Sequence, residues 1–182
     1  MKMAKKTAIA FLKLGFPFLM STSLSHAHSI TNPDQIKSLN ETLGLRSSSQ
    51  KLFIYGIINL NCPCSQSSFQ SFEEMATALR PNAQLIVLDV GATSISSFMK
   101  FKKALRPHFD LRYDPKKKSV ETFNARVTPS AYIVKDLAVI YQSAVIDPSK
   151  DPSPHYLSEA LKLVLAGKVA PSTDGFGCMI EN

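Results

Sequence analysis

Residues 52–67 read LFIYGIINLNCPCSQS, an apolar run that leads directly into two cysteines on either side of a proline. The run Leu52–Ile58 is dense in β-branched and aromatic side chains, which predicts a strand buried on both faces. Beyond the cysteines, apolar side chains recur at helical spacing, at Phe69, Phe72, Met75, Ala76 and Leu79. Cys62 and Cys64 are therefore expected where a buried strand ends and a helix begins.

A cysteine at the start of a helix has a reason to be reactive. The first N–H groups of a helix lack intrahelical partners, and the helix dipole adds positive potential there, so a thiolate is stabilised. The thiolate is the form that attacks disulfides and peroxides, and Pro63 suits the first helical turn. Cys62 is the candidate nucleophile, with Cys64 beside it. The alternative is that both are small buried apolar residues.

The rest of the chain continues as an alternation of strands and helices. Strands are predicted at 85–90, 109–113 and 131–134, the last joined to 138–146 as a hairpin. Helices are predicted at 36–45, 95–105, 119–125 and 157–165, and Gly167 ends the last one. This order predicts an α/β fold in which helices cover both faces of a central mixed sheet, closed by a C-terminal β-hairpin and helix.

The N-terminus has the pattern of a secretory signal. Lys2, Lys5 and Lys6 precede an apolar run, and Ser25-His26-Ala27 offers a cleavage site after Ala27. An uncleaved anchor helix is the alternative, but the uninterrupted apolar core, 14–20, is short for a bilayer. Cleavage would leave no stable membrane anchor and would place the protein in the periplasm or outside the cell.

The expected organisation follows from that cleavage. It has a signal peptide at 1–27, a domain at 28–167 whose residues 28–50 form an N-terminal helix and linker, and a tail at 168–182 with Cys178. The lysines at positions 2, 5, 6 and 13 leave with the signal, so the formal charge falls from +7 to +3. That modest charge gives no argument for nucleic-acid binding.

Three cysteines remain in an oxidising compartment: Cys62, Cys64 and Cys178. An odd number leaves open a free thiol, an intermolecular bond or a metal site. Cys178 lies eleven positions after Gly167, and this length could bring Cys178 back to the helix start. Cys178 is therefore a candidate resolving or clasping cysteine, the alternative being an incidental tail thiol.

Several motifs occur in a fixed order along residues 50–182. They are Cys62-Pro63-Cys64-Ser65, Tyr113-Asp114-Pro115 through Phe123-Asn124-Ala125, Arg126-Val127-Thr128-Pro129, Tyr141 to Asp147, and Leu161 to Ile180 with its Gly177-Cys178-Met179-Ile180 ending. Together they resemble the thioredoxin-like redoxin family, which is related to the AhpC/TSA peroxiredoxins and to exported thiol–disulfide oxidoreductases. The resemblance implies a thioredoxin fold, a cis Pro129 that faces Cys62, and partners that are protein thiols or disulfides.

The leading hypothesis is thus a thiol–disulfide oxidoreductase without a cofactor. Cys62 would attack a partner disulfide, Cys64 or Cys178 would resolve the mixed disulfide, and the Thr128-Pro129 loop would present backbone groups to the partner strand. Two alternatives stay open. One is a Cu(I)-binding metallochaperone of thioredoxin fold that uses Cys62 and Cys64 with Cys178 or a histidine. The other is a thiol peroxidase.

Overall fold

The computed structural model describes residues 31–45, 52–79, 83–143, 145, 156–172 and 176–181. The predicted signal peptide and cleavage site lie outside these residues, as do residues 46–51 before the first strand and residues 146–155 before the last helix. Among the described residues, no helix has the length and apolar character needed to cross a membrane.

A five-stranded mixed sheet forms the centre of the domain, in the order β3-β2-β1-β5-β6. Its strands are β1 (Leu52–Ile58), β2 (Ala83–Asp89), β3 (Asp110–Tyr113), β5 (Ser130–Lys135) and β6 (Ala138–Ser143). β1 pairs parallel with β2 and antiparallel with β5, and β6 completes a hairpin with β5. β1 is therefore hydrogen-bonded on both edges, and all seven of its residues are buried, as the apolar run predicted.

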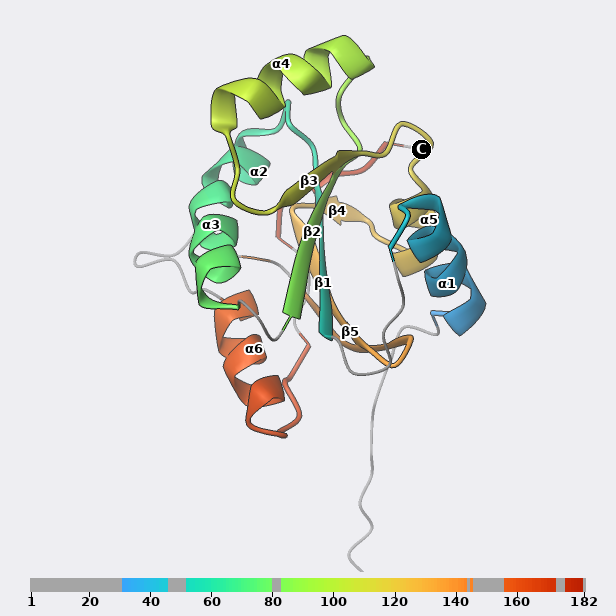
Figure 1. Ribbon diagram of the computed structural model, residues 1–182, viewed down its shortest axis with the longest axis vertical. Helices are drawn as coiled ribbons and strands as arrows, with labels where there is room; N and C mark the ends of the chain where they lie inside the picture. The colour runs from blue at the N-terminus through green and yellow to red at the C-terminus, as the bar shows by residue number, and fades with distance from the viewer. Residues whose placement is uncertain are drawn as a thin grey trace, which may run out of the picture.

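Helices cover both faces of the sheet (Figure 1). They are α1 (Pro33–Thr42), α2 (Pro63–Ser67), α3 (Phe69–Ala78), α4 (Ile95–Leu105), α5 (Lys118–Phe123) and α6 (Tyr156–Leu165). α3 and α6 lie on one face, and α1 and α5 lie on the other. The predicted architecture, including the hairpin followed by a helix, is confirmed. The single helix expected after the cysteines is instead two, because the chain turns at Ser68 between α2 and α3.

Alternate side chains of β1 enter two separate cores. Ile54 and Ile58 pack in the core beneath α3, α4 and α6, whereas Tyr55 and Ile57 pack in the core beneath α1 and α5. Gly56 makes room for a neighbour, because a Cβ at this position would lie 2.8 Å from Cζ of the Phe72 ring. The strand that leads to the cysteines is thus fixed from both sides.

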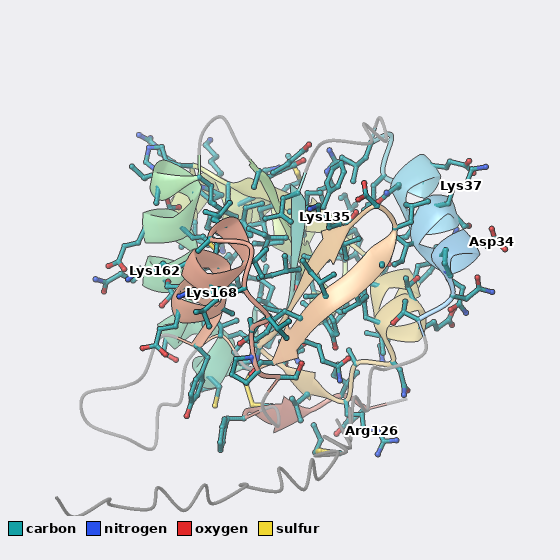
Figure 2. The ribbon with its side chains drawn as sticks, turned by 90° about the horizontal axis from the view of Figure 1, so that it is seen from below. Asp34, Lys37, Arg126, Lys135, Lys162 and Lys168 are labelled. Carbon is teal, nitrogen blue, oxygen red and sulfur yellow. A yellow bond between two sulfur atoms is a disulfide. The ribbon has the colours of Figure 1, made fainter. Side chains whose placement is uncertain are left out.

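A second, two-stranded sheet lies beside the first. β4 (Val127–Thr128) pairs antiparallel with β7 (Cys178–Met179), which belongs to the C-terminal tail. Figure 2 shows these two short strands at the lower side of the view, with a sulfur–sulfur bond next to them. The sequence identified residues 168–182 only as a tail and predicted no strand in it. Because part of the tail forms the strand β7, Cys178 lies at the end of the sheet where Cys62 and Cys64 lie.

Candidate functional site

The structure joins Cys62 to Cys178 in a disulfide that spans 116 positions of the sequence, with the two Cα atoms 6.8 Å apart. Cys64 is a free, half-buried thiol. The sulfur atoms of all three cysteines lie within 4.8 Å of one another. The three candidate residues therefore form one cluster, and the pairing that the sequence left open is between Cys62 and Cys178.

Cys62 lies at the N-cap of α2, directly after the loop that leaves β1. Its carbonyl oxygen accepts hydrogen bonds from the N–H groups of Ser65, at 3.0 Å, and Gln66, at 3.2 Å. Its sulfur makes no capping bond, and Pro63 occupies the first helical turn. The carbonyl of Cys62 thus forms the first hydrogen bonds of the helix, while its sulfur is bonded to Cys178. Only 4% of Cys62 is exposed.

A buried carboxyl group holds the loop in front of Cys62. Asp89, at the end of β2, accepts hydrogen bonds from the N–H groups of Leu60 at 3.0 Å, Gly91 at 3.1 Å and Ala92 at 3.1 Å. Burial raises the pKa of Asp89 above its ordinary value, and these three N–H bonds act in the opposite direction. Asp89 therefore ties the end of β1 to the end of β2, next to the sulfur cluster.

Two asparagines complete this loop. The side-chain oxygen of Asn59 accepts a hydrogen bond from the N–H of Asn61 at 2.9 Å, and the Asn61 amide donates to the Gly91 carbonyl at 2.8 Å. Ser65 accepts a hydrogen bond from the N–H of Asn59 at 3.0 Å. A Cβ at Gly91 would lie 1.8 Å from the Asn59 side-chain oxygen, so a larger residue there would displace the Asn59 side chain. Sequence analysis missed Asp89, Asn59, Asn61 and Gly91 as parts of the site.

The predicted proline loop lies against the same cluster. The Thr128–Pro129 bond is cis, as the family resemblance implied, and both residues are buried. Thr128 lies directly opposite Cys178 in the β4–β7 register. A cleft of about 460 Å³ borders this arrangement, and its lining includes Asn61, Cys62, Thr128 and Cys178. Thr128 of the proline loop and both cysteines of the disulfide thus line one open space.

The histidines considered as metal ligands do not join this cluster in the described part of the chain. His108 hydrogen-bonds Glu73 on α3 through its ring nitrogen at 2.8 Å and does not line the cleft beside the disulfide. His28 and His155 lie outside the described residues. The donor set present is therefore three sulfurs, which suits a soft ion such as Cu(I) when the disulfide is open.

Comparisons with known proteins support the fold. No protein-family model matches the sequence, and no curated protein sequence matches it. Among solved structures, an uncharacterized conserved protein from Geobacillus kaustophilus is similar at 21% identity and a TM-score of 0.65, over 74% of this chain and 78% of that one. A hypothetical protein from Sinorhizobium meliloti is similar at 17% identity and a TM-score of 0.63, over 72% and 80% of the two chains.

Other solved structures are similar to this chain with lower TM-scores, and some of them are named as redox proteins. StoA from Bacillus subtilis is similar at 13% identity and a TM-score of 0.48, over 52% of this chain and 74% of that one. The mixed five-stranded sheet, the helices on both faces and the cis-proline before β5 form the architecture that the sequence predicted. The chain therefore has the thioredoxin fold, and the two similar structures support it in fold alone. Its weaker structural neighbours include chains named as a thiol:disulfide interchange protein and as a disulfide oxidoreductase.

Proposed function

We propose that the protein is a thiol–disulfide oxidoreductase that cycles Cys62 and Cys178 between a disulfide and two thiols. The observation that carries this proposal is the bond between a cysteine at a strand-to-helix junction and a cysteine on a short strand paired with the proline loop. A structural disulfide would not need a third thiol within 4.8 Å or an open cleft along the bond.

In the reducing direction, the Cys62 thiolate attacks one sulfur of a partner disulfide. A bond forms between Cys62 and the partner sulfur, and the other partner sulfur leaves as a thiolate. The Cys178 thiolate then attacks the Cys62 sulfur, which forms the Cys62–Cys178 disulfide and releases the second partner thiol. The partner gains two electrons and the protein loses two, and the opposite sequence oxidises a dithiol partner.

Cys178 is the resolving cysteine in this scheme because β4 positions it. The register places Cys178 opposite Thr128, and the Ile180 N–H donates to the Arg126 carbonyl at 2.9 Å. Cys64 is adjacent, but it lies within α2, where its carbonyl accepts a hydrogen bond from the Ser67 hydroxyl at 2.8 Å. We propose that the protein works outside the cytoplasm, where disulfides persist.

Single-turnover reaction with Ellman's reagent tests the proposal. Reduced protein should show a fast phase in which Cys62 releases one thionitrobenzoate and Cys178 then displaces a second. Cys62→Ser should lose the fast phase, and Cys178→Ser should retain a mixed disulfide on Cys62 that mass mapping detects. The matched sulfur variant Cys64→Ser should still release the second thionitrobenzoate quickly. An undiminished fast phase in Cys62→Ser would remove Cys62 from the role of nucleophile.

The sulfur cluster also favours a second candidate, Cu(I) binding by the reduced protein. Three thiolates within 4.8 Å of one another offer a trigonal set of soft ligands. Anaerobic titration of the reduced chain with Cu(I) against a competing chelator should then give one tight equivalent, weakened in Cys64→Ser. Weak binding unaffected by the substitution would rule against this candidate. Thiol peroxidase activity stays a prediction, which peroxide consumption with a thiol donor would test.

A further inference from the structure

We infer that the edge of β4 next to Cys62 binds an extended segment of the partner protein, in which a glycine directly precedes the reacting cysteine. In the oxidised protein, residues 177–180 of the tail occupy this edge as an internal substitute for the partner. The inference rests on the proposed exchange chemistry of Cys62 and adds to it the sequence class of the partner.

The pairing of β4 is the first observation. Val127 and Thr128 belong to a two-stranded sheet, and the described strand that pairs with them is β7 of the tail. Without the tail, β4 would expose unpaired main-chain N–H and C=O groups, which bind extended peptides readily. Because Cys178 is opposite Thr128 and bonded to Cys62, the tail already has the arrangement of a peptide joined to the nucleophile.

Gly177 supplies the requirement for glycine. It has φ of +152°, and a Cβ on it would lie 2.1 Å from the Thr128 carbonyl oxygen and 2.7 Å from the Thr128 carbonyl carbon. These are main-chain atoms of a residue that is 1% exposed, so they cannot move aside as a flexible side chain could. A partner segment that replaces the tail residue for residue, with the same backbone conformation at the position of Gly177, meets the same atoms. Any side chain directly before its cysteine is therefore excluded.

The two positions after the cysteine differ in how closely the protein contacts their side chains. Met179 is 72% exposed, so this position accepts any side chain. Ile180 is half-buried against the core that also holds Tyr55 and Phe123, so an apolar residue fits there. The pattern that matches the edge is glycine, cysteine, any residue, and an apolar residue in extended conformation.

Exchange with such a partner balances without a further reagent. The partner thiolate attacks the Cys62 sulfur, a bond forms between Cys62 and the partner cysteine, and the Cys62–Cys178 bond breaks with Cys178 leaving as a thiolate. The tail strand and the partner strand compete for the same edge, so one departs as the other binds.

Two peptides that differ by one methyl group test the inference. The full-length variant Cys64→Ser/Gly177→Ala/Cys178→Ser retains Cys62 as its single cysteine, and its tail carries the excluded side chain at position 177. The probes are the capped peptides FGCMIE and FACMIE, each with thionitrobenzoate disulfide-bonded to its cysteine. Attack by Cys62 forms a protein–peptide disulfide and releases thionitrobenzoate, which is followed by absorbance, and mass spectrometry confirms the adduct.

We expect the glycine peptide to react at least about tenfold faster than the alanine peptide, because the clash is with fixed backbone. Equal rates for the two peptides, with Cys62 still reactive toward Ellman's reagent, would overturn this inference and leave the proposed function intact. Absence of reaction with every disulfide would overturn both.

Two further measurements keep the outcome unambiguous. Circular dichroism checks that the triple variant Cys64→Ser/Gly177→Ala/Cys178→Ser is folded. If the triple variant does not fold, the double variant Cys64→Ser/Cys178→Ser, which retains Gly177, takes its place. That second variant should react more slowly with FGCMIE than the first, because its tail still competes for β4. A disulfide-linked dimer of the oxidised full chain, joined through Cys62 and Cys178 of different copies, would assign the edge to a second copy and overturn the partner proposal.

Discussion

Opening the Cys62–Cys178 bond should lower the free energy of unfolding by a predictable amount. The bond closes a loop with a sequence separation of 116. Constraining a loop of this length in the unfolded chain removes entropy worth about 4.8 kcal/mol at room temperature. This value is the largest loss of stability expected, and it applies when the tail stays docked after reduction. A tail that detaches regains freedom in the folded state, and the loss of stability is then smaller.

Urea unfolding of the Cys64→Ser variant, oxidised and reduced, measures this difference. The sequence has no tryptophan, so far-UV circular dichroism is the suitable probe. With a slope of about 2 kcal/mol per molar urea, the full effect would shift the midpoint by about 2.4 M. Cys64→Ser prevents alternative pairing, and reduced and alkylated Cys178→Ser serves as the control that cannot form the bond.

The same difference appears in the redox equilibrium. A disulfide that stabilises the folded state by about 4.8 kcal/mol is harder to reduce in the folded than in the unfolded chain by about 100 mV. Equilibration with dithiothreitol buffers of known reduction potential, with and without denaturant, measures this difference in reduction potential. A stability change below about 1 kcal/mol, together with no offset, would refute the reasoning, because the bond would then not close this loop in the folded protein.

Three further predictions concern the framework of the site. Phe72→Ala should cost about 3–5 kcal/mol in urea unfolding, because the ring is fully buried and packs 5.8 Å from the Phe109 ring, centroid to centroid; a cost below about 1 kcal/mol would contradict this packing. Gly56→Ala should cost about 1–3 kcal/mol, because its Cβ would lie 2.8 Å from Cζ of Phe72, and combining it with Phe72→Leu should cost less than the sum of the two changes. Burial raises the folded-state pKa of Asp89, so this carboxyl contributes stability that is fully present below its unfolded pKa and is lost as the pH rises through its folded pKa. The free energy of unfolding of the wild type relative to that of Asp89→Asn should therefore be greatest below the unfolded-state pKa of Asp89. This difference should fall as the pH rises through the folded-state pKa, whereas a pH-independent difference would argue against a raised pKa.

The fold was predictable because its signals are local. The apolar run of β1 and the helical spacing that starts at Phe69 can be recognised within short windows of sequence. The chain order of strands and helices then restricts the topology to a mixed sheet covered on both faces. The break at Ser68 was missed, because helical spacing of apolar side chains continues across it.

The site was only half predictable, because its geometry depends on segments far apart in sequence. Spacing identified the three cysteines but could not decide which two pair, since that depends on where the tail returns. β7 has two residues and so shows no periodicity. The close contact at position 177 is with the Thr128 carbonyl, and that at position 91 is with the Asn59 side chain. Asp89 is an acid at the end of an apolar strand, but such an acid ordinarily marks only where a strand ends, so its position alone does not assign it to the site.

The double-sided burial of β1 has a consequence for motion during turnover. β1 is bonded on both edges and packed in both cores, so its amides should exchange with solvent only when the whole domain opens. Cys178, by contrast, is attached through a ladder of two residue pairs, which opens at low cost once the bond is cut. Cys62 thus lies four positions beyond the strand expected to exchange most slowly, whereas Cys178 lies on a short strand that opens readily. In the proposed exchange, the displacement falls on the tail, while Cys62 stays in place.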